Sequence, residues 1–321
     1  MIRLLFILSF ATVVLTSEAL SLNNGKASRR DFTNKLSSTI AVLAGIAQSS
    51  IFKEPVVASG LDPFCVIGAN GKTGTKCVQG LIERNIPVRA TSRSGVYIDD
   101  DADSKNPLLM PMVCDVTNPS TVETAVRGTR AVIFAASASK NGGTPAQVDN
   151  DGLVNVAKAC IAAKVPHLVI VSSGSVTKPE SPVYKFLNLF GKIMEEKIKG
   201  EDSVRALYSG VEGSTYTVIR PGGLTEEPAR GVDSLELNQG DTKSGRISRY
   251  DVASLCIEST FHPSLTGGTT FECYDADTGK ALSSVGMSNI MKQKTDPAEF
   301  VTGRERRGDT WEKLFTGLEK A

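Results

Sequence analysis

A short apolar run followed by three evenly spaced glycines constrains this chain more than any other feature. Residues 64–68 read FCVIG, and Gly68, Gly71 and Gly74 stand three residues apart. A strand that turns into a helix leaves free backbone N–H groups and the positive end of the helix dipole at one point, which suits a pyrophosphate. Gly68 permits the tight turn, Gly71 lets the backbone approach the phosphates, and Gly74 lets the helix close on the sheet. The alternative is a purely structural glycine turn.

From about residue 60, short β-branched runs alternate with longer amphipathic segments, the pattern of a parallel sheet flanked by helices. The expected strands are 64–68, 87–93, 110–116, 130–137, 167–174, 214–223 and 269–275, and the expected helices are 73–85, 120–128, 147–164, 184–210 and 249–261. A loop is expected over 224–248, and two helical stretches after 275. The pattern predicts an α/β fold, a doubly wound parallel sheet in one domain over 60–321, with a smaller C-terminal part from about 222.

The first 59 residues have the composition of a targeting sequence. A 12-residue apolar stretch, LLFILSFATVVL, precedes small residues that suit cleavage after Ala19, so residues 1–19 are predicted to be a signal peptide. Residues 20–59 resemble a transit peptide, and SRRDFTNK within them resembles a twin-arginine signal. Together they indicate the plastid of an alga with secondary plastids, with the stroma favoured over the thylakoid lumen. The alternative is a plain secretory signal followed by a spacer.

Charge and cysteine usage exclude several partners. The net charge is +1 and the basic residues are scattered, so we expect no nucleic-acid partner. The six cysteines form no C-x-x-C pair and fall mostly within expected strands and helices, so we predict buried free thiols, a reducing compartment and no metal site. The 12-residue apolar stretch is too short for a membrane span, so no stable span is expected in the mature chain.

Four separated motifs carry a resemblance to a known family. VIGANGKTGTKCVQGL, VDNDGLVNVAKACIAAKVPHLVIVSSGSV, YTVIRPGGLTEEP and GRISRYDVASLC occur in that order between residues 62 and 275. Together they resemble the atypical short-chain dehydrogenase/reductases, in particular the NmrA-like, NAD(P)-binding plastid group. The resemblance implies an extended Rossmann domain whose cofactor lies over the strand ends, with a C-terminal part that closes over the substrate.

The resemblance also implies the cofactor residues. They are Gly68, Asn70, Gly71, Lys72, Thr73 and Gly74 in the phosphate loop, Arg93 after the second strand, Asp115 after the third, Ala135, Ala136 and Ser137 after the fourth, and Pro221 and Gly222 after the sixth. Arg93, with Ser92 or Ser94, stands where an acid would hydrogen-bond an unmodified ribose, so NADP(H) is preferred over NAD(H). The alternative for Arg93 is a solvated surface residue.

Catalysis departs from the family pattern. Ordinary members use a serine after the fifth strand and a Tyr-x-x-x-Lys pair, because a phenol beside an ammonium can protonate the carbonyl that receives hydride. Ser172 or Ser173 matches the serine, and Lys197 matches the lysine. Ile193 stands where the tyrosine belongs, and Tyr184 is the nearest substitute. The alternative for Lys197 is an exposed i,i+4 pair with Glu201.

Three function classes follow. The first is an NADPH-dependent reductase of a small carbonyl, quinone, flavin or pigment-like substrate, with Ser172 or Ser173 polarising the acceptor. The second is a non-catalytic NADP(H) redox sensor or assembly factor that docks on a plastid protein, which the missing tyrosine favours. The third, a nucleotide-sugar epimerase, needs the Tyr–Lys pair and fits least. The reductase is preferred, because relatives without that tyrosine use water or a substrate group as proton donor.

Overall fold

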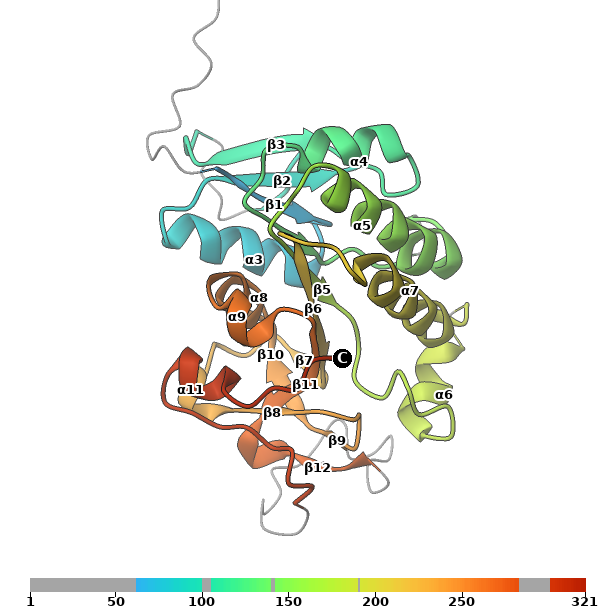
Figure 1. The fold of residues 1–321 in the computed structure, drawn as a ribbon, viewed down its shortest axis with the longest axis vertical. Helices are drawn as coiled ribbons and strands as arrows, with labels where there is room; N and C mark the ends of the chain where they lie inside the picture. Colours follow the sequence, from blue (N-terminus) through green and yellow to red (C-terminus); the bar gives the residue numbers. More distant parts are fainter. Residues whose placement is uncertain (1–61, 100–104, 140–141, 190, 283–300) are drawn as a thin grey trace, which may run out of the picture. The chain divides into compact units, whose positions relative to one another are not determined.

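A central sheet organises the part of the chain that the structure, a computed structural model, describes: residues 62–99, 105–139, 142–189, 191–282 and 301–321. In these residues the main sheet has eight strands in the order β3-β2-β1-β4-β5-β6-β11-β8 (Figure 1). Their bounds are β1 Phe64–Ile67, β2 Val88–Ser92, β3 Leu109–Val113, β4 Ala131–Phe134, β5 His167–Val171, β6 Thr215–Pro221, β8 Leu235–Asn238 and β11 Thr269–Asp275. Only the β11–β8 pair of this sheet is antiparallel. The predicted doubly wound parallel sheet is therefore confirmed.

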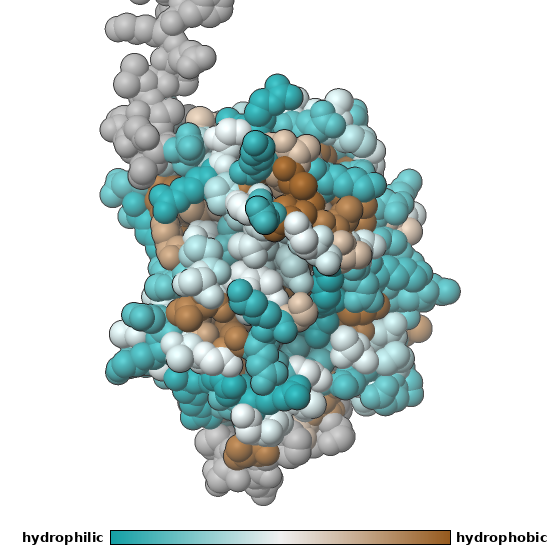
Figure 2. All heavy atoms as spheres, viewed as in Figure 1, coloured by the Kyte–Doolittle hydropathy of each residue, from teal (hydrophilic) through white to brown (hydrophobic). Residues whose placement is uncertain are grey.

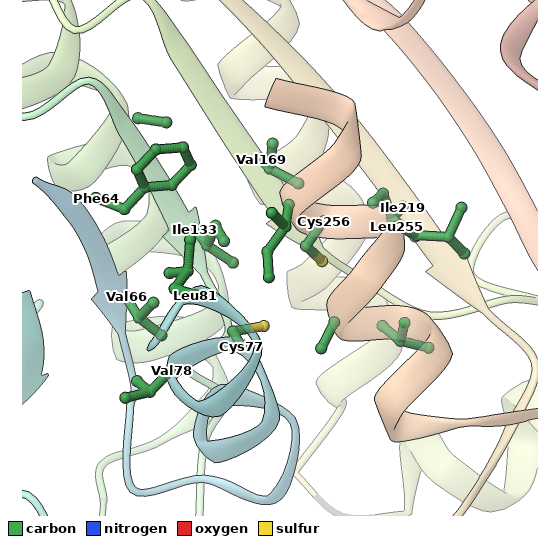
Figure 3. Close-up of a cluster of buried hydrophobic side chains, with 14 of the residues drawn as sticks. Phe64, Val66, Cys77, Val78, Leu81, Ile133, Val169, Ile219, Leu255 and Cys256 are labelled. Atoms are coloured by element: carbon green, nitrogen blue, oxygen red, sulfur yellow. The ribbon is translucent and has the colours of Figure 1, made fainter. Parts of the chain in front are cut away.

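Helices cover both faces of this sheet, because each strand sends alternate side chains to opposite sides. Phe64 and Val66 of β1 join a core cluster with α3 (Lys72–Glu83) and α8 (Arg249–Phe261), which Figure 3 shows in close-up. The side chains between them, Cys65 and Ile67, face a second cluster on the other side. That cluster includes α4 (Pro119–Val126), α5 (Leu153–Ala162) and α7 (Ile193–Tyr208). The near-continuous apolar runs in the sequence reflect burial of both sheet faces.

The cysteines are part of this core. All six are free and buried. Figure 3 shows Cys77 of α3 and Cys256 of α8 where the two helices face each other. The prediction that the cysteines act as small core residues is confirmed.

Two expected helices are divided in the structure. The segment expected at 147–164 begins as a π-helix, η2 (Ala146–Gly152), which continues into α5. The segment expected at 184–210 consists of α6 (Pro182–Asn188) and α7. Lys192 adopts a left-handed conformation, with φ of 64°, immediately before α7. Lys192 therefore sets the direction in which α7 starts. The periodicity of this polar sequence did not reveal the break between α6 and α7.

The expectation of a loop over 224–248 was wrong. This stretch contains β8 at the edge of the main sheet and most of two small sheets. One small sheet pairs β7 (Gly223–Thr225) with β10 (Arg246–Ser248), and the other pairs β9 (Lys243–Ser244) with β12 (Lys280–Ala281). The strands escaped detection because they are short and carry buried charges: Lys243 is ion-paired with Glu236 of β8 at 2.8 Å. Such a pair satisfies both charges without producing an apolar alternation.

The C-terminal segment completes the β8 edge. Leu237 of β8 exchanges both backbone hydrogen bonds with Arg306, at 3.0 and 2.8 Å. In α11 (Trp311–Phe315), the Phe315 ring lies 6.2 Å from that of Phe271 in β11. Of the two helical stretches expected after 275, this is the one that falls within the described residues. Short elements complete these residues: η3 Val232–Ser234, α9 Pro263–Thr266 and η4 Ala276–Thr278.

The face of the described part of the chain that Figure 2 shows is mostly polar. In the view of Figure 2, apolar side chains form separate patches among polar ones. None of the helices in the described ranges combines the length and the apolar character that crossing a bilayer requires. The predicted signal peptide and transit-like segment lie outside the described residues, so the predicted boundary at residue 60 stays a prediction.

Candidate functional site

One cavity lies where the strand order reverses. β1 is followed along the chain by α3 on one sheet face, whereas its neighbour β4 leads toward η2 and α5 on the other, so their carboxyl ends diverge. The cavity measures about 480 Å³. The residues that line it are Ile67, Gly68, Asn70, Gly71, Thr91, Ser92, Arg93, Ser94, Cys114, Asp115, Val116, Ala135, Ala136, Ser137, Ser139, Gly142 and Val148. Eight of the predicted cofactor residues line the cavity: Gly68, Asn70, Gly71, Arg93, Asp115, Ala135, Ala136 and Ser137. A ninth, Gly74, packs directly behind the glycine loop.

The structure explains why glycine stands at each of the three positions of the loop. Gly68 has φ of +83°, and a Cβ there would lie 2.7 Å from the Cα of Ala136. A side chain at Gly74 would collide with the carbonyl oxygen of Gly68. Gly71 has an ordinary φ of −79°, and its missing Cβ would lie 3.1 Å from Gly68 O and 3.9 Å from Ala135 O. Gly68 and Gly74 thus allow close backbone packing, whereas Gly71 keeps space open at the cavity.

The N-terminus of α3 carries unused donors at this cavity. Gly71 is the N-cap, it provides no side-chain acceptor, and no acidic residue occupies the first turn. The first N–H groups of a helix lack intrahelical acceptors, and the dipole adds a partial positive charge there. An anionic ligand therefore finds both hydrogen-bond donors and a favourable potential beside Gly71.

Two other loop residues serve different purposes. The Asn70 side chain donates to Val96 O at 2.9 Å and accepts from the N–H of Ile98 at 3.0 Å. It therefore fastens the segment after β2 to the glycine loop. Thr73 is buried, and Lys72 points to Glu226, with 3.5 Å between Nζ and Oε1. Neither Lys72 nor Thr73 is among the residues that line the cavity.

The end of β2 contributes a polar rim without a carboxylate. Ser92, Arg93 and Ser94 all line the cavity. The Ser92 hydroxyl donates to Val96 O at 2.8 Å, which fixes the turn. Asp115 lines the cavity from the end of β3, and its Oδ1 accepts hydrogen bonds from Thr117 N–H and Thr117 Oγ1 at 2.9 and 2.8 Å. Among the described residues of the cavity wall, Asp115 is the one acid, and its own turn holds it.

A buried ion pair stands behind the wall formed by β4. Ser137 donates to Asp149 Oδ1 at 2.7 Å, and Ala138 N–H donates to the other carboxylate oxygen at 2.9 Å. Lys197 Nζ lies 2.7 Å from Asp149 Oδ1, and the two side chains are 12% and 0% exposed. The interpretation of Lys197 as an exposed partner of Glu201 is therefore wrong. Its ammonium is linked through Asp149 to Ser137 in the cavity wall, two polar contacts away.

Ser172 belongs to a second polar group beside this ion pair. Its hydroxyl donates to Glu201 Oε1 at 2.5 Å. Ser172, Glu201, Lys197 and Asp149 all line a small space of about 10 Å³. Burial opposes ionisation of Glu201, but Arg220 outweighs it, so the pKa of Glu201 lies below its ordinary value. The fold thus places Ser172 and Lys197 around the same small space, but the Ser172 proton is committed to a carboxylate.

The remaining candidates lie apart from these cavities. The Ser173 hydroxyl donates to Gly174 O at 3.1 Å. Pro221 ends β6 and accepts from Gly174 N–H at 2.9 Å, while Gly222 N–H donates to Cys273 O at 3.0 Å. Tyr184 packs against Val176 and Met194 in a small core cluster, and burial raises its pKa. None of these residues lines either cavity described above.

Asp149, Arg220 and Glu272 were not identified from sequence. Arg220 Nη2 binds Glu201 Oε2 at 2.6 Å, and Arg220 Nη1 lies 3.3 Å from Glu272 Oε1. A lone charged residue within an apolar strand, such as Arg220 in YTVIRP, is a usable signal, because burial of a charge requires a partner. The partner itself cannot be read from local sequence, since it comes from α7 or β11.

Comparisons with known proteins agree with this geometry. Residues 68–263 match the family described as NAD(P)H-binding. An uncharacterised chloroplast protein of Arabidopsis thaliana is 32% identical over 204 residues, which cover 60% of this chain and 70% of the relative. The chloroplast protein TIC 62 of Oryza sativa subsp. japonica is 29% identical over 222 residues, covering 62% of this chain and 43% of that protein. The chain therefore spans less than half of this TIC 62.

Solved structures support the fold. A wide-type short-chain dehydrogenase/reductase of Veillonella parvula, in complex with NADP, superimposes with a TM-score of 0.53 at 17% identity, covering 68% of this chain and 96% of that chain. ChuY of Escherichia coli O157:H7, described as an anaerobillin reductase, gives 0.53 at 20% identity and covers 68% of this chain and 100% of its own. At these identities the similarity concerns the fold alone.

Proposed function

Because the chain belongs to the NAD(P)H-binding family, we propose that it is an NADP(H)-dependent reductase that transfers hydride to a small carbonyl, quinone, flavin or pigment-like substrate. The observation that carries this proposal is the cavity at the carboxyl ends of β1 and β4, with an uncapped helix N-terminus beside it. The residues fit a dinucleotide, since the absence of a side chain at Gly71 lets a pyrophosphate approach the backbone there. A side chain at this position would fill the space near the Gly68 and Ala135 carbonyl oxygens.

The end of β2 supports the preference for NADP(H). Ser92, Arg93 and Ser94 line the cavity there, and no carboxylate from β2 stands among them to bind an unmodified ribose. A guanidinium can meet a 2′-phosphate with two charge-assisted hydrogen bonds. Arg93→Ala should therefore weaken NADPH by about one to two orders of magnitude and leave NADH nearly unchanged. Calorimetric titration of both cofactors into both proteins measures this, and equal losses would contradict the assignment.

Lys197 is the residue that we propose supports the reaction. NADPH supplies the hydride, which places negative charge on the acceptor oxygen. Asp149 binds the Lys197 ammonium behind Ser137, which lines the cavity. Both side chains are largely buried, and a buried charge stabilises negative charge nearby more strongly than an exposed one does. The Ser172 hydroxyl donates its proton to Glu201, so the Ser172 oxygen can only accept further hydrogen bonds. The Ser173 hydroxyl makes the longer internal hydrogen bond, 3.1 Å to Gly174 O.

A second candidate is a non-catalytic NADP(H) redox sensor or assembly factor that docks on a plastid protein. The hydrogen bond from Ser172 to Glu201 favours it, since this removes one donor from a site that already lacks the family tyrosine at Ile193. The relatives named TIC 62 are chloroplast proteins more than twice as long as the matched region. Their extra length leaves room for docking functions that this region alone does not specify.

Steady-state oxidation of NADPH by the purified protein, against a panel of quinones, flavins and enones, separates the two functions. Turnover that Lys197→Met abolishes and Lys185→Met spares would support the reductase. Lys185 is a suitable control because it lies on α6, outside both cavities. Tight NADPH binding without turnover on any acceptor would instead support the sensor.

We also propose that the protein acts in a plastid, with the stroma favoured because NADPH is produced there. The chloroplast relatives support a plastid, and the predicted two-part N-terminus suggests a secondary one. Residues 1–50 fused to a fluorescent protein should enter the plastid of an alga with secondary plastids, whereas residues 20–50 alone should not. Secretion of the first fusion would refute this location, and protease protection in isolated thylakoids would separate lumen from stroma.

A further inference from the structure

A group of basic side chains lies where α3 begins beside α8. In the parallel pair of β7 and β10, Thr225 stands opposite Ser248, so the next residues, Glu226 and Arg249, leave the small sheet side by side. Arg249 Nη1 binds Glu226 Oε1 at 2.7 Å, and Lys72 Nζ reaches the same oxygen at 3.5 Å. One carboxylate oxygen thus serves two cations that come from different parts of the chain.

Two cations in this group share one carboxylate. Lys76 adds a third cation, which lies 4.4 Å from the centre of the Tyr250 ring. Glu226 is 55% exposed and Lys72 is 74% exposed, and ion pairs of this kind contribute little to stability. Arg249 is different, because its side chain is only 16% exposed. Its Nε is buried and has no hydrogen-bond partner within the described residues. This guanidinium therefore has one buried N–H that no described residue satisfies.

The position of the group relates it to the phosphate loop. Lys72 follows Gly71, which lines the cavity at the carboxyl ends of β1 and β4. Glu226 follows Gly222 by four residues, and Gly222 stands at the end of β6, where the resemblance places the nicotinamide end of the cofactor. The group therefore lies on the side of the phosphate loop toward the C-terminal part of the chain.

We propose that Lys72 and Arg249 form an oxyanion-binding site in which Glu226 occupies the place of the ligand until a phosphate or carboxylate displaces it. This inference rests on the proposed function for its location, because the anion is either the nicotinamide-side phosphate of the dinucleotide or an acidic group of the substrate. Two cations around one oxygen suit either group, since both present oxygens that accept charge-assisted hydrogen bonds. Displacement exchanges one anion for another and leaves no buried charge unpaired.

Titrations with NADP⁺ and 2′,5′-ADP test the phosphate, because 2′,5′-ADP lacks the nicotinamide-side phosphate. Arg249→Gln should weaken NADP⁺ by about tenfold and leave 2′,5′-ADP unchanged. Glu226→Gln should tighten NADP⁺ severalfold, a gain that unfolding cannot produce. The matched controls are Arg84→Gln and Glu258→Gln, because this pair joins the other end of α3 to α8 at 3.4 Å. Both controls should bind NADP⁺ like the parent protein.

Malonate and inorganic pyrophosphate complete the test. Malonate that binds the NADP⁺-saturated parent, but not Arg249→Gln, would assign the site to a carboxylate of the substrate. Pyrophosphate titrated alone tests the cations independently of any dinucleotide. A parent protein that binds neither NADP⁺ nor 2′,5′-ADP would refute the proposed function, whereas Arg249-dependent binding of pyrophosphate would still support the oxyanion site. If Arg249→Gln and Glu226→Gln bind all four probes like the parent protein, the site is refuted.

Discussion

Glu272→Gln should remove a loss of stability that the protein suffers in mildly alkaline solution. Burial raises the pKa of Glu272 to about 8, and the nearby charge of Asp241 adds to the effect. Arg220 opposes the shift, but its shorter contact is with Glu201, at 2.6 Å against 3.3 Å to Glu272. The hydrogen bond from Asp241 N–H to Glu272 Oε2, at 2.9 Å, also lowers the pKa of Glu272, but burial outweighs both effects. Of the two carboxyl groups beside Arg220, Glu201 therefore carries the charge and Glu272 keeps a proton.

The sign and size follow from the two pKa values. An unfolded glutamate titrates near 4.5 and the folded one near 8. The folded state therefore binds a proton that the unfolded chain has released, and stability is full below 4.5 and declines as the pH rises through 8. At about 1.36 kcal/mol per pH unit, the loss between about pH 6.5 and pH 8.5 is roughly 2 kcal/mol.

Urea denaturation across that pH range, followed by the fluorescence of Trp311, measures the effect. The difference in free energy of unfolding between Glu272→Gln and the parent protein should rise by roughly 2 kcal/mol in favour of the variant from about pH 6.5 to pH 8.5. Taking the difference cancels the titration of other groups. Glu123→Gln, an exposed change on α4, should follow the parent protein at every pH. Parallel pH profiles for the parent protein and Glu272→Gln would refute the reasoning.

Other substitutions distinguish the roles of residues at the cavity. Gly71→Val should abolish NADPH binding in a calorimetric titration with little loss of stability, because Gly71 has an ordinary φ, lines the cavity, and its Cβ would require only a small shift of Gly68 O, 3.1 Å away. Gly74→Ala should lower both the midpoint of thermal unfolding and NADPH affinity, because its methyl group would collide with Gly68; an unchanged midpoint would contradict the packing argument. Asp149→Asn should cost about 3 kcal/mol in urea denaturation, since it leaves the Lys197 charge buried without its partner.

Much of the fold was predictable because local patterns determine it. The apolar runs of β1, β4 and β5 reflect burial of both sheet faces, and the glycines of the phosphate loop each meet a close approach that only a missing Cβ allows. β8 could not be predicted in the same way. Its inward-facing Glu236 is satisfied by Lys243, Arg307 and the Tyr274 hydroxyl, so a buried strand appears polar in sequence.

The grouping of the expected cofactor residues at one sheet edge was predictable from sequence, whereas the surroundings of the expected catalytic residues were less so. Strand ends of a parallel sheet meet at one edge, so Arg93, Asp115 and Ser137 were brought together by strand order alone. Lys197 and Ser172 depend on which side chains from other elements reach them. Asp149 on η2 lies 48 residues before Lys197, and nothing in the local sequence indicates that this acid, and not Glu201, is its partner.

The position of residues 301–321 has a consequence for how the protein is made. These residues leave the ribosome after every strand of the main sheet, yet Arg306 pairs with β8 and Phe315 packs on β11. A nascent chain therefore exposes the β8 edge and the apolar surface around Phe271 until residues 301–321 emerge. Unpaired strand edges and open apolar surface are what chaperones bind and what aggregates grow from. The time between synthesis of β11 and of α11 is thus the interval in which this chain most needs a chaperone.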